Sequence, residues 1–190
     1  MNTVTNRQAT SGLLASAAFL SSPHFDERPT DVDIDLLVIH CISLPPEQYG
    51  GDYVEDFFQG KLDCSLHPYF QQLVSVRVSA HLYIRRDGRL IQFVPLDKRA
   101  WHAGLSEFAG HAKCNDFSIG IELEGDVNHP YTLEQYRCLT AVTQEIQARY
   151  PLITQARITG HSDIAPVRKD DPGPYFDWQH YFACLNSKDN

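Results

Sequence analysis

A short aliphatic run followed by a histidine constrains the fold more than any other feature of this chain. Leu36 to Ile39 are consecutive branched aliphatic residues, and His40 follows them directly. A continuous apolar run of about four to eight residues is typical of a strand that is buried on both faces of a sheet. We therefore expect a central strand here. His40 would lie where that strand leaves the sheet, a common place for ligands in open α/β sheets.

Three further segments have the pattern of strands. Val76 to Ile84 alternates between apolar and polar residues, and Asp87-Gly88 forms a hairpin turn onto Leu90 to Val94. Ser118 to Gly125 also alternates, with Ile119, Ile121 and Leu123 on one side. A shorter strand is expected at 157–159. Together these segments predict an α/β fold.

Helical signals lie between and after these strands. Thr132 and Gln135 have the spacing of a capping box and precede a helical apolar pattern that ends before Pro151. A last helix is expected at about 178–185. We also expect a helix packed on the domain at 12–20, for which a non-standard export signal is the alternative. The predicted architecture is a mixed central β-sheet flanked by helices.

Two loops interrupt this pattern. The stretch 45–73 is long and irregular, and loops of that length in a compact domain are usually functional or mobile. Gly160 and His161 are followed by a loop that Pro166, Pro172, Gly173 and Pro174 keep from becoming helical. We expect both loops to lie near a functional site.

Length and charge limit the class of protein. The 190 residues fit one domain, 1–190, with flexible ends at 1–10 and 186–190. A domain of this size does not need a metal to fold, so a metal site would serve chemistry. The net charge of −8 and the lack of a basic run disfavour nucleic acid as a partner. We expect a monomer that binds no membrane.

Five widely spaced cysteines and no Cys-x-x-Cys pair argue against a disulfide framework. The reducing cytoplasm suits such a chain.

Position selects metal ligands among the nine histidines. His40 ends the predicted central strand, His161 follows another strand, and Asp171 lies ten positions later on the same proline-rich loop. Two imidazoles and a carboxylate leave a fourth tetrahedral position open, as in hydrolytic zinc sites. The spacing alone leaves an alternative open, namely histidines that cap elements or are satisfied within the core.

The chain resembles a known family in several ordered blocks, which together extend from about Gly12 to Trp178. They include Trp101-His102-Ala103-Gly104, and they cover residues 37–46, 77–88, 97–104, 115–125 and 160–174. In these blocks the sequence is similar to the AmpD amidases, cytosolic enzymes that cleave 1,6-anhydro-N-acetylmuramyl-L-alanine in cell-wall recycling. The resemblance implies a fold shared with peptidoglycan-recognition proteins and a muropeptide, a small molecule, as substrate.

The resemblance also implies roles for individual residues. The family's zinc ligands match His40, His161 and Asp171. Glu122 matches the catalytic acid/base, which takes a proton from the attacking water, and Lys169 matches the cation that stabilises the developing oxyanion. The Zn²⁺ ion is the implied cofactor.

Substrate contacts are expected at Arg77, Trp101, His102 and Cys41. Arg77 would pair with a carboxylate of the stem peptide. Trp101 and His102 would line the groove, with a plain core role as the alternative for Trp101. The family more often has Asn than Cys after its first ligand, so Cys41 removes one amide contact.

Two other functions remain open. A wall-lytic amidase would act on polymeric peptidoglycan, and a recognition module would bind muropeptides without cleaving them. The sequence shows no wall-binding repeat, and it retains all three positions that match the zinc ligands. Both observations favour the recycling amidase.

Overall fold

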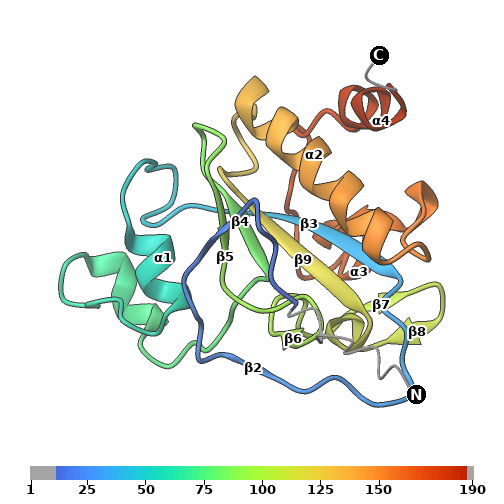
Figure 1. Cartoon of the computed structure of the whole chain (residues 1–190). Coiled ribbons are helices and arrows are strands. Elements are labelled where there is room, and N and C mark those ends of the chain that lie inside the picture. The colour runs from blue at the N-terminus through green and yellow to red at the C-terminus, as the bar shows by residue number, and fades with distance from the viewer. Residues whose placement is uncertain (1–11, 188–190) are drawn as a thin grey trace, which may run out of the picture.

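The central sheet has six strands and both strand orientations (Figure 1). This computed structural model describes residues 12–187. Strands β4 and β5 pair antiparallel, whereas the other neighbours in the sheet are parallel. In spatial order the strands are β1 (Ala18–Phe19), β5 (Leu90–Gln92), β4 (Leu82–Ile84), β9 (Ser118–Glu124), β3 (Leu36–Ile42) and β10 (Ile158–Gly160). The predicted mixed sheet is confirmed.

Helices α2 (Leu133–Arg149) and α4 (Trp178–Asn186) cover one face of the sheet. Alternate residues of the two central strands face them, because successive side chains of a strand point to opposite faces. The contacts form one buried cluster that includes Leu37 and Ile39 of β3, Ile119, Ile121 and Leu123 of β9, and Leu139, Val142 and Ile146 of α2. The remaining side chains of β3 and β9 therefore point to the other face of the sheet, where the candidate site lies.

The beginning of α2 follows the predicted capping box. The Thr132 hydroxyl accepts a hydrogen bond from the Gln135 N–H at 3.1 Å, and the Gln135 side chain accepts from the Thr132 N–H at 3.1 Å. Gln135 also donates to the carbonyls of Ile84 and Glu124, at the ends of β4 and β9. The cap thus fixes both the start of the helix and its position against the sheet.

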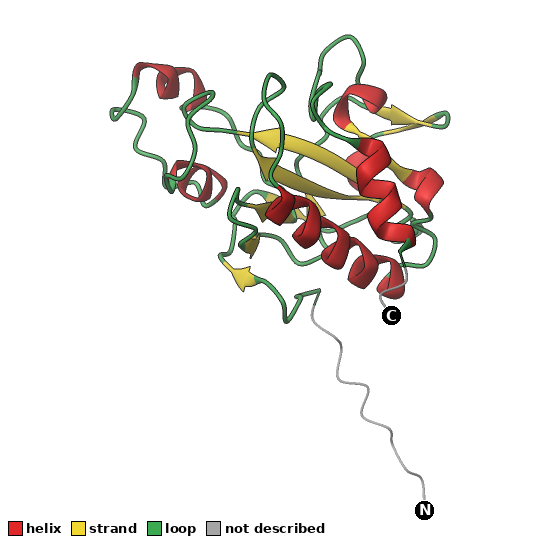
Figure 2. Ribbon diagram, turned by 90° about the horizontal axis from the view of Figure 1, so that it is seen from above, coloured by secondary structure: helices red, strands yellow, loops and turns green. Residues whose placement is uncertain are grey.

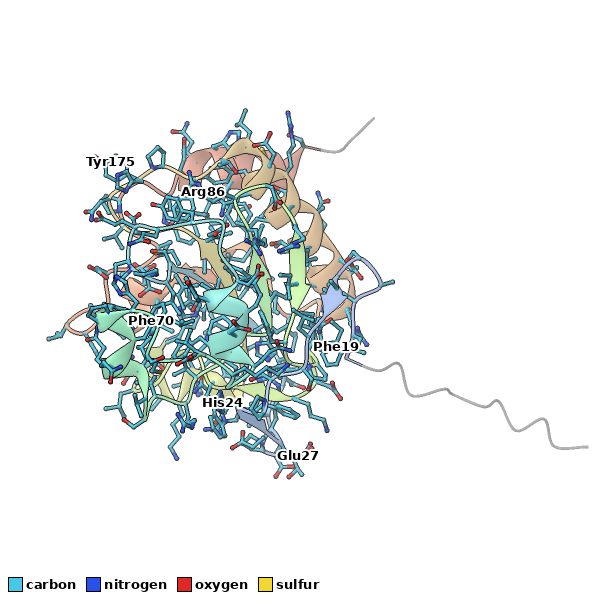
Figure 3. The ribbon with its side chains drawn as sticks, turned by 90° about the vertical axis from the view of Figure 1, so that its left-hand side faces the viewer. Phe19, His24, Glu27, Phe70, Arg86 and Tyr175 are labelled. Carbon is cyan, nitrogen blue, oxygen red and sulfur yellow. The ribbon has the colours of Figure 1, made fainter. Side chains whose placement is uncertain are left out.

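The long stretch 45–73 folds into a lobe on the other side of the sheet. Its helices are α1 (Tyr53–Phe58) and η1 (Pro68–Leu73). Aromatic side chains hold it in place: Phe58 packs edge-on against Phe93 next to β5, and Phe70 packs against Tyr53. Figure 3 labels Phe70 within this lobe. Figure 2 shows this lobe at the end of the sheet away from α2. The predicted irregular loop is therefore partly helical and packed.

Short elements complete the chain. They are the antiparallel pairs β2 (Phe25–Asp26) with β6 (Arg99–Ala100) and β7 (Glu107–Phe108) with β8 (His111–Ala112), the 3₁₀ turns η2 (Cys114–Asp116) and η3 (Gln155–Arg157), and the single-turn helix α3 (His161–Ile164). Between residues 12 and 187, no helix has both the length and the apolar character needed to cross a membrane.

The structure corrects three predicted elements. The helix expected at 12–20 is absent: bonds to Gln92 and Leu96 hold Gly12 and Leu14, the chain then turns at 14–17, and Ala18–Phe19 pairs with β5. In the predicted strand 76–84 only Leu82–Ile84 belongs to the sheet. The chain after Gly160 forms the one-turn helix α3 before Pro166 ends it.

Of the ends predicted to be flexible, residues 1–10 and 188–190 lie outside the described residues, and Asn186 is the last residue of α4.

Candidate metal centre and catalytic cavity

Two histidines and one aspartate converge at the end of β3. The Nδ1 atoms of His40 and His161 lie 3.0 Å apart, and the Asp171 Oδ2 atom lies 3.0 Å from the first and 3.1 Å from the second. All three side chains are buried. The structure therefore brings together the three residues that the sequence selected, as a group that could hold a metal ion.

Local structure explains this convergence. Strands β3 and β10 are parallel, with Gly160 paired to Ile39, so the next residues along the two strands are His161 and His40. Asp171 reaches them because its loop packs closely on Gly160, where a Cβ atom would lie only 2.8 Å from the Pro172 ring. The Ser162 N–H also donates to the Asp171 carbonyl at 2.8 Å. A larger residue than glycine at 160 would push the carboxylate away.

The electrostatics of the group favour the protonation state that a cation requires. Burial lowers the pKa of His40 to about 4, against the opposing effect of Asp171. Burial alone would raise the pKa of Asp171, but the hydrogen bonds to His161 and His40 hold it well below its usual range. Near neutral pH the group thus offers a neutral His40 imidazole and an ionised carboxylate, as metal ligation demands.

The spacing of the three atoms also suits zinc. Ligand atoms bound to Zn²⁺ at ~2.0–2.2 Å in a tetrahedron lie roughly 3.3 Å from one another. The distances of 3.0–3.1 Å within this group are a few tenths of an ångström shorter. The donor set and its geometry therefore fit zinc.

Glu122 lies beside the group on the same face of the sheet. It is the register partner of His40 on β3 and of Tyr83 on β4. Its Oε2 atom is buried without a hydrogen-bond partner. Burial raises the pKa of Glu122 well above its ordinary value, Asp171 adds to the effect, and Lys169 opposes it. An unpartnered carboxylate with a raised pKa is suited to proton transfer.

One cavity of about 240 Å³ is lined by His161, Asp171 and Glu122, while the buried His40 lies behind its wall. Its polar wall includes Glu122, His161, Lys169 and Asp171, and its apolar wall comes largely from the α1 lobe and the segment after it. The side chains that line it are Cys41, Ile42, Phe57, Phe58, Leu73, Val76, Val78, Ser79, His102, Glu122, His161, Lys169 and Asp171. The 45–73 stretch thus supplies part of a wall of the site.

The predicted substrate contacts have different positions. Cys41 and His102 line the cavity, and burial raises the pKa of the Cys41 thiol, which disfavours a nucleophilic role. Arg77 does not line it: this exposed residue donates to the carbonyls of Val74 and Val76 and borders a neighbouring cavity. Trp101 also lies outside the lining and stacks on His24, with ring centroids 6.2 Å apart. Contact with substrate stays a prediction for all four.

His81 is a further buried histidine near the site, and it has a structural role. Its Nδ1 atom accepts a hydrogen bond from the Gly120 N–H at 3.0 Å, and its Nε2 atom lies 3.0 Å from the Lys98 carbonyl. It therefore links β9 to the segment before β6. It is not part of the group formed by His40, His161 and Asp171.

Sequence reasoning missed Arg28. This buried guanidinium donates to the backbone carbonyls of Leu96, Asn115, Asp116 and Ser118. Burial lowers its pKa to about 10. Its Nη2 atom also lies 3.0 Å from the His81 Nε2 atom. No motif marks a residue whose partners are mostly main-chain carbonyls, so a sequence pattern could not have identified it.

Comparisons with known proteins identify the family of the chain. The chain is 58% identical over 174 residues to the 1,6-anhydro-N-acetylmuramyl-L-alanine amidase AmpD of Haemophilus influenzae, covering 92% of this chain and 95% of that protein. A crystal structure of a selenomethionine AmpD derivative matches with a TM-score of 0.89 and 53% identity, over 92% of this chain and 97% of that one.

A more distant match is the Escherichia coli amidase AmiD in complex with the substrate anhydro-N-acetylmuramic acid-L-Ala-D-γ-Glu-L-Lys. Its TM-score is 0.60 at 29% identity, over 85% of this chain and 65% of that one. Finally, the sequence profile of the N-acetylmuramoyl-L-alanine amidase family (Amidase_2) matches residues 30–174. The chain belongs to the N-acetylmuramoyl-L-alanine amidase family.

Proposed function

We propose that this protein is a zinc-dependent amidase of peptidoglycan recycling. It hydrolyses the amide bond between the lactyl group of 1,6-anhydro-N-acetylmuramic acid and the L-alanine of the stem peptide. The AmpD proteins of Haemophilus influenzae and Escherichia coli, which the chain matches over 95% and 96% of their length, carry the name of this activity. The AmiD complex holds a substrate with the same anhydro-muramyl-L-alanine linkage.

One observation carries the proposal. The imidazoles of His40 and His161 and the carboxylate of Asp171 meet within 3.1 Å, and the same cavity contains Glu122 and Lys169. A metal-ligand set, a carboxylate with a raised pKa and a cation are the groups that metal-assisted amide hydrolysis needs.

The residues have separate roles in this proposal. Bound zinc supplies a Lewis acid that polarises the scissile carbonyl and lowers the pKa of water. Glu122 takes the proton of the attacking water and passes it to the leaving nitrogen of L-alanine. The Lys169 ammonium, which already acts on Glu122 and His40 through its charge, stabilises the negative charge that develops on the carbonyl oxygen.

We further propose that the protein works in the cytoplasm as a monomer. Its five cysteines are all unpaired, as suits a reducing compartment. Its substrate would be a soluble muropeptide that one cavity can hold.

The experiment combines metal analysis with two substrates. The purified protein is expected to contain about one equivalent of zinc and to release peptide from soluble anhydro-muropeptides. Intact sacculi serve as the comparison. Strong lysis of sacculi with little turnover of anhydro-muropeptides would favour a wall-lytic enzyme, and binding without cleavage of either would favour a recognition module.

A further inference from the structure

We propose that His102 and Ala103 form a support that orients both metal-binding imidazoles, and that Asn115 and Arg168 hold this support in place. The inference rests on the proposed metal site. It assigns positioning roles to His102, Asn115 and Arg168, and it replaces substrate contact as the main role of His102.

The first link runs from His40 to His102. The His40 Nδ1 atom faces His161 and Asp171, so ligation through this atom leaves the proton of the neutral ring on Nε2. That Nε2 atom lies 2.9 Å from the His102 Nδ1 atom, and the two rings are nearly perpendicular at 83°. His40 therefore donates to His102.

The hydrogen bond from His40 determines which ring nitrogen of His102 carries the proton. A neutral His102 that accepts at Nδ1 carries its own proton on Nε2, and this atom lies 3.1 Å from the Ser118 hydroxyl. Each hydrogen bond in the series from His40 through His102 to Ser118 thus has one donor and one acceptor. Both ring nitrogens of His102 have partners within the protein, so neither is left for a substrate.

The second link runs from His161 to the next residue of the same segment. The His161 Nε2 atom lies 3.1 Å from the Ala103 carbonyl oxygen. A carbonyl can only accept, so His161 carries its proton on Nε2 and presents an unprotonated Nδ1 atom to the metal. Adjacent residues thus select the tautomers of both imidazoles, one through a side chain and the other through the backbone.

Arg168 holds the Ala103 carbonyl from outside. Its Nη2 atom donates to this oxygen at 2.6 Å and to the Leu105 carbonyl at 2.8 Å. A carbonyl oxygen has two lone pairs, so it can accept from Arg168 and His161 together. Arg168 itself is exposed, and its Nη2 atom also lies 3.4 Å from the His161 Nε2 atom, on the side of that ring away from the metal-facing Nδ1 atom.

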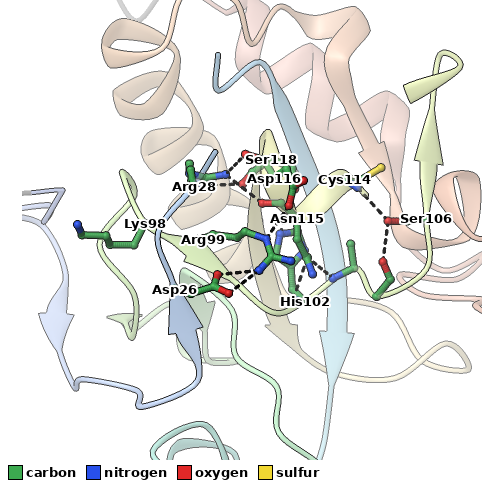
Figure 4. Close-up of polar contacts among 12 residues, drawn as sticks. Asp26, Arg28, Lys98, Arg99, His102, Ser106, Cys114, Asn115, Asp116 and Ser118 are labelled. Atoms are coloured by element: carbon green, nitrogen blue, oxygen red, sulfur yellow. Dashed lines mark hydrogen bonds and ion pairs between the residues drawn. The ribbon is translucent and has the colours of Figure 1, made fainter. Parts of the chain in front are cut away.

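Asn115 holds the backbone of the same segment from inside (Figure 4). Its Oδ1 atom accepts from the N–H groups of His102 at 3.2 Å and Ala103 at 2.8 Å. Asn115 is buried, and Arg28 donates to its carbonyl at 3.1 Å. The segment is therefore bonded to the residues before β9 and cannot shift independently of them.

Gly120 makes room for the ring of His102. A Cβ atom at this position would lie 2.5 Å from the Cγ and Nδ1 atoms of His102. Any side chain at position 120 would displace the ring and break its bond to His40. The glycine in the centre of β9 is thus explained by the support.

Zinc affinity is the direct readout of this support, because partners of metal-bound histidines typically contribute a factor of about 10–100 to affinity. The experiment measures the zinc dissociation constant of the folded protein by competition with a chromophoric chelator. Cobalt absorption spectra report the coordination geometry independently of activity. Melting curves of the metal-free proteins show that each variant is folded.

We expect His102→Leu to weaken zinc binding by about 10–100-fold. His102→Asn should restore most of the affinity, because its Oδ1 atom can accept from His40 where Nδ1 does. Arg168→Met changes an exposed residue outside the buried core, and it should weaken binding severalfold, with Arg168→Lys closer to wild type. His180→Asn, at a partly buried histidine of α4 that packs on Tyr136 and has no contact with the support, is the matched control.

The outcomes separate this inference from the proposed function. Wild-type affinity in both folded His102→Leu and Arg168→Met would overturn the inference while leaving the metal site intact. If His102→Leu does not fold, the zinc affinities of Arg168→Met and Arg168→Lys test the inference by themselves, and wild-type affinity in Arg168→Met overturns it. A wild-type protein that binds no zinc would instead contradict the proposed function itself.

Discussion

Glu122 lies next to His40 in the sheet, as its register partner between the parallel strands β9 and β3. Two residues further along β9, Glu124 points to the same face but has a different environment. Its carboxylate accepts from the N–H groups of Gly50 at 2.5 Å and Arg86 at 2.9 Å, whereas Glu122 has an unpartnered oxygen. The two glutamates on this strand face thus differ in role: Glu122 is a candidate catalytic group, and Glu124 is structural.

Glu122→Ala should keep zinc but lose nearly all turnover. Positioned acid/base groups contribute about 10²–10⁴-fold to rate, so kcat is expected to fall by that factor. The measurement is the rate of release of peptide from anhydro-muropeptide, together with the zinc content of the variant. Undiminished activity would remove Glu122 from the mechanism.

Glu124→Ala should instead lower stability. Two hydrogen bonds to a charged acceptor are lost and their N–H donors are left without that partner, so we expect the free energy of unfolding to fall by about 2–4 kcal/mol. Denaturant unfolding of the zinc-free proteins measures it. Glu122→Ala is the control and should be unchanged or more stable, because it removes a buried oxygen without a partner. Equal losses in the two variants would contradict this division.

Lys169→Ala should lower kcat while leaving zinc binding near wild type. Loss of one group that stabilises an oxyanion typically costs about 10²–10³-fold. Lys169→Arg keeps the charge and should recover part of the rate. The measurement is kcat and KM at saturating zinc. A change in KM alone would show that Lys169 binds substrate without acting on the chemistry.

Acid should destabilise the metal-free protein through its buried histidines. Burial lowers the pKa of His81 to about 3 and that of His40 to about 4, from about 6.5 in the unfolded chain. Stability from these neutral rings is fully present above pH ~6.5 and is lost as the pH falls through the folded values, by up to ~1.4 kcal/mol per pH unit for each ring.

The slope of the unfolding free energy against pH shows whether His81 causes the loss of stability in acid. His81→Asn should flatten the decrease below pH ~6.5, because the ring that resists protonation is gone. His111→Asn changes an exposed histidine on β8 and serves as the control. Urea unfolding across the pH range provides the measurement. A slope in His81→Asn equal to that of the wild type would show that His81 titrates normally.

The sequence predicted those elements whose signals are local. The aliphatic run of β3, the alternation of β9 and the capping box of α2 each lie within a few residues, and each is confirmed. The prediction of a helix at 12–20 was wrong because its small apolar residues favour a helix locally, while the distant Gln92 side chain binds the backbone of Gly12 and Leu14 and β5 pairs with Ala18–Phe19. Helix propensity depends on neighbouring residues and does not include such a long-range contact.

The candidate site was also predicted from the sequence only in part. Strand ends, a proline-rich loop and the resemblance together selected His40, His161 and Asp171, which the structure brings within 3.1 Å. The support of these residues was not visible in the sequence. Asn115 and Arg168 act on main-chain groups of a distant segment, and such bonds leave no spacing pattern between side chains.

The central claim is that one divalent cation is bound by His40, His161 and Asp171. Anomalous diffraction at the zinc edge, from crystals of the zinc-loaded protein, tests it most directly. We predict one peak within ~2.0–2.2 Å of the Nδ1 atoms of both histidines and of an Asp171 carboxylate oxygen. A fully loaded protein with its zinc elsewhere, or with these three side chains turned apart, would contradict the account.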